Sequence, residues 1–403
     1  MRKPAPSRRS LRGLDWFNFF IGDVQTGFGP FVAVHLTAQA WTQAEIGLVL
    51  TAGSLVALAG QIPGGAIVDA ARSKRRVAAV AVTLIALSAL TLALWPIFPA
   101  VLAAQVLHGA ASCMITPAVA AISLGLVGHA AIAERLGRNA RFASFGNGIA
   151  AAVMGICGYL ISPEAVFFIT AASVVPALLA ITHVKPAEID PSRARGAASD
   201  PDDERNARPS LLDLARNRPL LIFAGCVLLF HLANAGMLPL IAGLVTMRSS
   251  DWAPAFIGAG IVVPQLVVAA ISPWVGQQAE HRGRRPLLLL GFAAQAIRGL
   301  LFVVLTDPAF FVIIQILDGV SAAAFGVMVP LVVADVTRKT GHYSLALGVV
   351  GTAAGIGASF STTLAGTMAD AFGGHAAFLA LAGIVVAGFG LVWMFMPETR
   401  PDD

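Results

Sequence analysis

The chain has 403 residues, of which 57% are hydrophobic and only 12% are charged, and its formal net charge is +5. An average soluble protein carries roughly 25% charged residues, so the composition excludes a soluble globular domain and predicts a polytopic membrane protein. It also excludes disordered, collagen-like and disulfide-scaffold chains. The apolar runs are about 20 residues long and do not alternate, which favours helices over a transmembrane barrel.

Twelve apolar stretches, separated by polar or Pro/Gly breaks, predict twelve transmembrane helices. In chain order we expect them at 14–37, 44–69, 76–95, 99–127, 139–160, 164–183, 219–246, 253–279, 286–305, 308–335, 343–369 and 374–396. The first run follows a basic N-terminus and superficially resembles a secretory signal. It is longer than a signal core of roughly 7–15 residues and contains Asp23, so we interpret it as a retained helix.

One long hydrophilic connection divides the chain into six helices on either side. It carries basic and acidic residues, several prolines and small polar residues, which is typical of a cytosolic linker. The expected organisation is a cytoplasmic N-tail at 1–13, a six-helix bundle at 14–183, the linker at 184–218, a second bundle at 219–396 and a cytoplasmic C-tail at 397–403.

The positions of the basic residues predict the orientation. All 27 Lys and Arg except Arg248 and Arg298 fall on the tails, the linker or the connections on one side of the twelve spans. By the positive-inside rule both termini are cytoplasmic, and the basic balance indicates topology, with no nucleic-acid partner. The cysteines stand singly in apolar segments, without metal-ligand spacing: Cys113, Cys157 and Cys226.

The two halves repeat each other at an offset of about 210 residues, as transporter repeats do. The matching positions are Gln25 and Gly27 with Asn234 and Gly236, Gly65 and Asp69 with Gly276 and Glu280, and Gln105 and His108 with Gln315 and Asp318. The second pair belongs to a recurring motif, Gly65-Ala-Ile-Val-Asp69 followed by basic residues, and Gly276-Gln-Gln-Ala-Glu280 followed by Gly283-Arg284-Arg285.

With these motifs the sequence resembles the major facilitator superfamily over nearly the whole chain. The resemblance implies an all-α membrane fold of twelve helices in two pseudo-symmetric six-helix bundles, working as a secondary transporter by alternating access. It also implies that Asp69 faces the positive N-terminus of helix 11. We expect a cytoplasmic latch formed by Gly65, Asp69, Lys74, Arg75, Gly276, Glu280, Arg284 and Arg285. The alternative is that these charges are only topology anchors.

Two departures from the drug–proton antiporter families limit what the motifs assign. Gln105 stands where those families usually carry an Arg in helix 4. Helix 5 is rich in glycine but lacks their Pro. The motifs alone therefore do not assign export.

Polar groups inside the membrane are the candidate site, because a charge there costs at least about 2.5–3.5 kcal/mol. Helices 1, 4, 7 and 10, which the resemblance implies line a cavity, each carry one: Asp23, His108, His231 and Asp318. At about 1.5 Å per residue, His108 and Asp318 lie at similar depth, and Arg298 is close enough in depth to pair with Asp318.

Each of these groups has a functional interpretation and a structural alternative. Asp23 and Asp318 are candidate proton acceptors, and His108 and His231 can relay protons or bind substrate. Neutral hydrogen bonds would come from Gln25, Gln105, Asn234 and Gln315. Alternatively, Asp318 and Arg298 form a static ion pair, and the two histidines are packed core residues.

The sequence contains no His-Glu-x-x-His pair, no Gly-x-Ser-x-Gly elbow and no nucleotide-binding loop. A membrane-embedded enzyme or receptor is therefore disfavoured, and we expect no enzyme activity, cofactor or metal. We predict proton-coupled export of a small organic or amphipathic solute by a monomer in a bacterial-type inner membrane. Proton-coupled uptake of a small organic ion stays open as the alternative.

Overall fold

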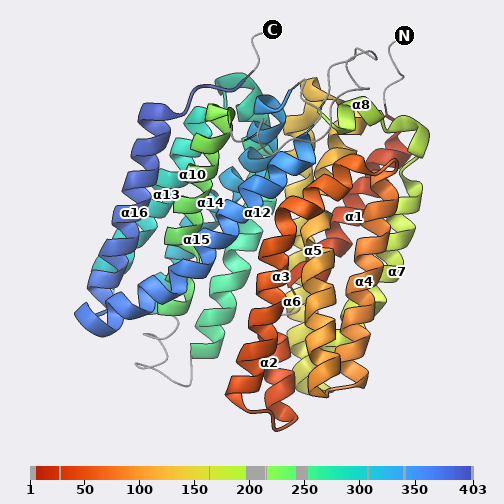
Figure 1. Cartoon of the computed structure of the whole chain (residues 1–403). Helices are drawn as coiled ribbons and strands as arrows, with labels where there is room; N and C mark the ends of the chain where they lie inside the picture. Colours follow the sequence, from red (N-terminus) through yellow and green to blue (C-terminus); the bar gives the residue numbers. More distant parts are fainter. Residues whose placement is uncertain are drawn as a thin grey trace. The chain divides into compact units, whose positions relative to one another are not determined.

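The computed structural model describes residues 6–26, 29–162, 164–196, 214, 216–241, 253–305, 308–338 and 342–400 (Figure 1). Within helices, the side chains of a few residues lie outside this description, Asp23 and Gln25 among them. Arg248 and most of the predicted linker also lie outside it.

The first half of the chain folds into helices that follow the apolar stretches. They are α1 (Arg8–Thr26), α2 (Gly29–Ala38), α3 (Gln43–Ala70), α4 (Lys74–Leu94), α5 (Phe98–Val127), α6 (Ile132–Leu160), α7 (Ala165–His183) and the short α8 (Pro191–Ala194). Thr42 and Glu45 form a reciprocal capping box at the start of α3, and Ser73 caps α4. Short polar residues between apolar runs thus set where these helices begin.

The second half follows the same plan. Its helices are α10 (Arg218–Asn234), α12 (Ala253–Arg282), α13 (Arg285–Val304), α14 (Pro308–Val336), α15 (Tyr343–Phe372) and α16 (Gly374–Phe395). Within the described residues, eleven helical segments are long and apolar enough to cross a membrane. They correspond to the second to twelfth predicted spans, and the first predicted span contains most of α1 and nearly all of α2.

Two helices begin earlier than the apolar pattern predicts. α1 begins at Arg8, inside the predicted N-tail, and α6 begins at Ile132, although the expected span began at 139. Asp15 of α1 pairs with Arg135 and Arg138 of α6, so these charges are satisfied within helices.

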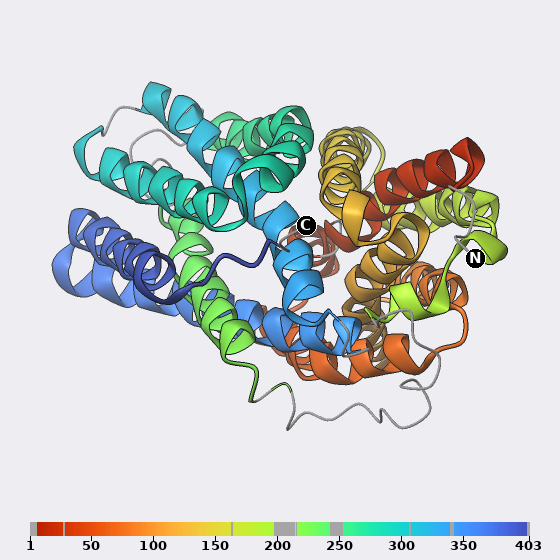
Figure 2. The same cartoon turned by 90° about the horizontal axis from the view of Figure 1, so that it is seen from above.

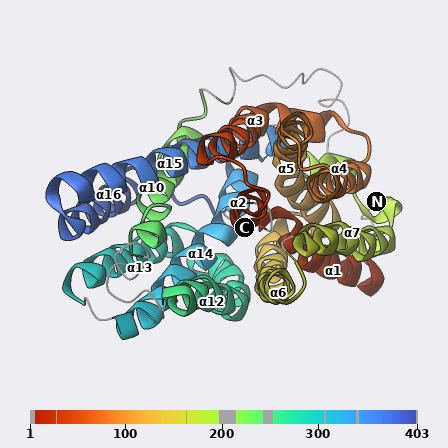
Figure 3. The ribbon, with the colours of Figure 1, turned by 90° about the horizontal axis from the view of Figure 1, so that it is seen from below.

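The chain divides into two compact units. Unit 1 comprises residues 1–209 and 337–348, and unit 2 comprises residues 210–336 and 349–403. In unit 1, α5 packs on α3 and α4, and α7 packs on α1 and α4; in unit 2, α14 packs on α12 and α13, and α16 packs on α10 and α13 (Figures 2 and 3). These packings correspond between the two halves, in agreement with the sequence repeat.

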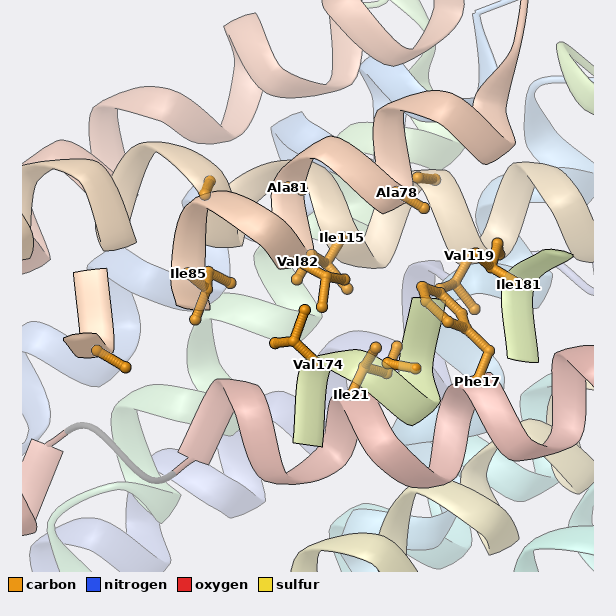
Figure 4. Packing of buried hydrophobic residues seen from close by; sticks show 14 of the residues in the cluster. Phe17, Ile21, Ala78, Ala81, Val82, Ile85, Ile115, Val119, Val174 and Ile181 are labelled. Atoms are coloured by element: carbon orange, nitrogen blue, oxygen red, sulfur yellow. The ribbon is translucent and has the colours of Figure 1, made fainter. Parts of the chain in front are cut away.

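Each helix bundle is held by small and branched apolar side chains. In unit 1, Ile21 of α1 lies against Val174 of α7, with Val82 of α4 and Ile115 of α5 beside them, and Phe17 of α1 lies further along the same cluster (Figure 4). All five are 5% exposed or less. Because the lipid-facing sides of the helices are apolar as well, close packing of this kind has to hold the helices together.

Candidate functional site

The carboxylate of Asp69 binds the start of α15, within unit 1. Its Oδ1 accepts a hydrogen bond from the Ser344 amide at 3.1 Å, and its Oδ2 accepts one from the Leu345 amide at 2.8 Å. Asp69 is 4% exposed. Unpaired amides and the helix dipole make a helix N-terminus a site for a negative charge. The structure thus places Asp69 at the start of α15, which corresponds to the eleventh predicted span.

The other predicted latch residues of unit 1 support this contact in different ways. A Cβ on Gly65 would lie 3.0 Å or less from three backbone atoms of Ser344 and Leu345, so α3 and α15 approach too closely for a side chain. Lys74 donates to the carbonyls of Val68, Asp69 and Ala71 at 2.6, 2.8 and 3.0 Å, which caps the end of α3. Arg75 donates to the Val184 carbonyl at 2.7 Å.

The second copy of the motif, in unit 2, is centred on its arginine. Arg284 is 1% exposed and its Nε donates to Asp335 at 2.9 Å. Its Nη1 donates to the Ala279 carbonyl, the C-terminal end of α12, at 2.6 Å. Glu280 lies only 3.7 Å from the same guanidinium, and its buried Oε1 makes no hydrogen bond to any described residue.

The C-terminal tail completes this second copy. Glu398 accepts hydrogen bonds from the amides of Arg284 and Arg285 at 2.7 and 3.1 Å, and so caps the start of α13. Arg285 lies over the ring of Trp393 and donates to its carbonyl. Gly276 is buried in α12 one turn before Glu280.

A polar cluster lies at mid-span in unit 2, on α10, α13 and α14. Arg298 is 1% exposed and donates to Asp318 at 2.8 Å, to Asn234 at 2.6 Å and to Gln315 at 3.0 Å. Its guanidinium also lies 5.5 Å from the centre of the Phe302 ring. The pairing of Arg298 with Asp318 is the one that their depths in the sequence predict. We call these four polar residues, together with His231, the α10–α13–α14 cluster.

Exposure differs within the α10–α13–α14 cluster. The Asp318 side chain is 17% exposed, whereas Arg298 and Gln315 are 1% and 0% exposed. His231 is half-buried, and its Nδ1 lies 2.9 Å from the Val227 carbonyl. A carbonyl only accepts, so this contact assigns the proton to Nδ1 and leaves Nε2 as an acceptor in the neutral ring.

The corresponding residues of unit 1 form a more neutral set. His108 of α5 is half-buried, and its Nε2 lies 3.2 Å from the Ser112 hydroxyl. Gln105, one turn away, is 4% exposed, and its Nε2 makes no hydrogen bond within the described part of the chain. Asp23 and Gln25 fall near the end of α1, and their side chains lie outside the described residues.

Further contacts between ionisable side chains were not predicted from the sequence. Asp15 binds Arg135 and Arg138, and Arg135 also donates to Asn139 at 2.7 Å. The signal was available: Arg135 and Arg138 are three residues apart, so they share a helix face once α6 is extended. The apolar pattern, which begins the span at 139, places both arginines in a connection instead.

The second unpredicted pair joins α2 to the start of α7. His35 is fully buried, with Nε2 3.1 Å from the Leu92 carbonyl and Nδ1 3.6 Å from Glu164. Backbone and side-chain hydrogen bonds, with a smaller contribution from His35, hold the pKa of Glu164 below its usual value. Nothing in the sequence brings these two residues together, because they are far apart in the chain.

The family model of the Major Facilitator Superfamily matches residues 15–245 and 223–403. Two strains of Mycobacterium tuberculosis, CDC 1551 and H37Rv, each have an uncharacterized MFS-type transporter that is 38% identical over 396 residues. In each case the alignment covers 98% of this chain and 95% of the relative.

Solved transporter structures share the fold at low sequence identity. The chain is similar to FucP in the outward conformation, with a TM-score of 0.75 and 17% identity over 96% of this chain and 98% of that one. It is similar to the human organic anion transporter MFSD10, with a TM-score of 0.70 and 17% identity over 97% and 100%. For the proton:xylose symporter XylE the TM-score is 0.69 and the identity 15%, over 97% and 96%.

Proposed function

The chain belongs to the Major Facilitator Superfamily, and from this premise we propose that it is a proton-coupled exporter of a small organic or amphipathic solute. It is a multi-pass membrane protein and a secondary transporter. The proposal adds the coupling ion, the direction and the class of solute. It describes transport without chemical conversion of the solute, by a monomer in a bacterial-type inner membrane with both termini cytoplasmic.

The observation that carries the proposal is the carboxylate of Asp318. Asp318 lies within the hydrophobic span of α14 and keeps 17% of its side chain exposed, whereas its partner Arg298 is enclosed. A guanidinium stays charged at any accessible pH, so Asp318 is the member of the pair that can gain and lose a proton. A carboxyl that can titrate within the membrane is what proton coupling needs.

The remaining candidates have supporting roles in this proposal. Asp23 is a second proton-accepting carboxyl, and the latch residues stabilise one state of the alternating-access cycle. His108 and His231 relay protons or bind solute. Neutral hydrogen bonds to the solute come from Gln25, Gln105, Asn234 and Gln315.

The test is transport of a panel of metabolites and toxins in everted membrane vesicles with an imposed pH gradient. We expect at least one solute to accumulate only while the gradient lasts, and an uncoupler to abolish the accumulation. Asp318→Asn and Asp23→Asn should each abolish gradient-driven accumulation, and in Asp23→Asn solute exchange should persist. Asp370→Asn is the matched control, because Asp370 is an exposed carboxylate near the end of α15.

Two outcomes would overturn the proposal. Gradient-driven transport that is undiminished in Asp318→Asn removes Asp318 from the coupling step. Accumulation that requires the opposite gradient would show proton-coupled uptake instead of export.

A further inference from the structure

We propose that the α10–α13–α14 cluster recognises a protonated amine, and that the amine and a proton compete for Asp318. This inference rests on the proposed transport function and names the class of substrate that the same site takes. It follows from which polar atoms of the cluster are enclosed and which are available to a solute.

Arg298 is not the group that a solute meets. Its side chain is 1% exposed, and it already donates to three oxygens on two neighbouring helices, that of Asn234 on α10 and those of Gln315 and Asp318 on α14. The ring of Phe302 lies against the guanidinium as well. An anionic solute would have to displace these partners to reach the cation. Arg298 therefore positions the carboxylate of Asp318 and does not bind solute itself.

Asp318 offers a free acceptor. Its Oδ1 accepts from Arg298 at 2.8 Å, and its Oδ2 accepts no hydrogen bond from any described residue. Oδ2 is not one of the buried polar atoms that lack a partner, so it is accessible, in agreement with the 17% exposure of the side chain. A carboxylate oxygen in a partly enclosed site favours a donor that carries positive charge, because a charge-assisted hydrogen bond is the stronger kind.

His231 offers a second acceptor on the neighbouring helix. Its Nδ1 carries the ring proton that is donated to the Val227 carbonyl, so Nε2 presents a lone pair. His231 and Asn234 are three residues apart on α10 and share one face. Asn234 and Asp318 accept from the same Nη1 atom of Arg298, so the face of α10 that carries Asn234 and His231 is the one that meets this part of the cluster.

Two acceptors, one of them charged, match an ammonium group with several N–H donors. A carboxylate solute would meet lone pairs at both positions, and a neutral alcohol would gain only ordinary hydrogen bonds. The apolar walls of the helices would hold the rest of an amphipathic amine.

Competition with a proton follows directly from this arrangement. When Asp318 is protonated, it has no negative charge to attract an ammonium group. An amine that binds where Asp318 holds a proton therefore displaces that proton, and by linkage the proton weakens amine binding by the same factor. One carboxylate that holds either a proton or the amine exchanges the two across the membrane.

The experiment measures binding and proton exchange with three probes of similar shape: 2-phenylethylamine, 3-phenylpropionate and 2-phenylethanol. The full-length protein in lipid nanodiscs is titrated by calorimetry and, in weakly buffered solution with an indicator dye, for protons released or taken up. We expect the amine to bind at least about tenfold more tightly than the alcohol and to release protons. We expect the amine to lose affinity as the pH is lowered.

Variants assign the effect to the cluster. Asp318→Asn keeps an oxygen for Arg298 but no charge, and should abolish both the preference for the amine and the proton release. His231→Phe should weaken amine binding by about 3- to 10-fold while proton release persists. Asp370→Asn should bind as the unsubstituted protein does. Thermal unfolding of each variant in the nanodisc checks that it is folded.

Two results would overturn the inference. One is an amine that binds no better than the alcohol, and the other is tighter binding of 3-phenylpropionate with proton uptake, which would assign an anion site to Arg298. Failure of the proposed function is distinguishable from both. In that case the amine still binds with proton release, but no solute accumulates in vesicles under a pH gradient.

Discussion

The two copies of the Gly-x-x-x-Asp/Glu motif use different residues to hold their surroundings. In unit 1 the acid is central: Asp69 accepts two backbone amides at the start of α15, and Lys74 caps the end of α3. In unit 2 the base is central: Arg284 is paired with Asp335, and Glu280 makes only a 3.7 Å contact. Equivalent positions in a repeat therefore carry unequal parts of the stability.

The difference follows from what each acid meets. Asp69 lies at a helix N-terminus, where two amides point at its two oxygens, and these bonds hold whether or not a cation is near. Glu280 is 33% exposed and meets a guanidinium that already has a buried carboxylate partner. An ion pair of that kind contributes little. How much an acidic residue stabilises its surroundings depends on the donors that its oxygens meet, not on its position in the motif.

The largest expected effect is that of Arg284→Ala. It removes the guanidinium that pairs with the buried carboxylate of Asp335, and breaking a buried ion pair costs about 3–5 kcal/mol. Amide hydrogen exchange at the start of α13 should therefore accelerate at least about 100-fold. Lys74→Ala should accelerate exchange at the end of α3 much less, because Lys74 donates only to backbone carbonyls. The exposed Arg282 supplies the control, Arg282→Ala. Equal effects of Arg284→Ala and Lys74→Ala would remove the contrast between the two copies.

Asp69→Ala is expected to have the next largest effect. It removes two charge-assisted hydrogen bonds to α15, which together contribute about 2–4 kcal/mol. Exchange of the Ser344 and Leu345 amides should accelerate about 30-fold or more. Asp69→Asn keeps one acceptor and should have an intermediate effect. Glu280→Ala, the matched change in unit 2, should cost about 1 kcal/mol or less. The interpretation fails if Glu280→Ala loosens unit 2 as much as Asp69→Ala loosens the start of α15.

Much of this fold could be predicted from the sequence, because in a membrane protein the length of each apolar run indicates a helix directly. A hydrocarbon layer requires about 20 apolar residues per helix, so ends such as Phe98–Val127 of α5 lie close to the expected 99–127. The rule failed where a helix continues beyond the apolar run. At α6 the polar residues Arg135 and Arg138 resembled a loop, and only their contact with Asp15 shows why they are helical.

The candidate site could be predicted only in part. The depth of a residue in the membrane follows from the number of residues between it and the end of its helix. The proximity of Arg298 to Asp318 could therefore be predicted. Which way a side chain points around its helix depends on packing between helices. Only the three-dimensional structure could therefore show that Arg298 is enclosed, that Oδ2 of Asp318 is exposed and that His35 contacts Glu164.

The smallest expected effect concerns a carboxylate outside both copies of the motif. Glu188, after α7, accepts the Ser7 amide and hydroxyl at 2.9 Å each, just before α1 begins. It resembles Asp69 in accepting a backbone amide at a helix start, but it lies near the surface and is half-buried. Burial raises the pKa of Glu188, but hydrogen bonds from Ser7 and Ser10 and a contact with Lys185 outweigh this and lower the pKa to about 2.

The sign of the pH dependence follows from that lowered pKa. The ordinary pKa is 4.5, so the contact stabilises the start of α1 fully above that pH and loses its effect as the pH falls toward about 2. We compare amide protection in the Ser7–Leu11 segment between the unsubstituted protein and Glu188→Gln, corrected for intrinsic exchange. The ratio should be tenfold or less at about pH 6 and should approach one near pH 2, since solvent weakens a contact near the surface. Glu45→Gln, at the capping box of α3, should leave this ratio unchanged. A ratio that stays constant over this range would mean that the charge of Glu188 does not stabilise the start of α1. Its oxygens would then act as neutral acceptors, unlike those of Asp69.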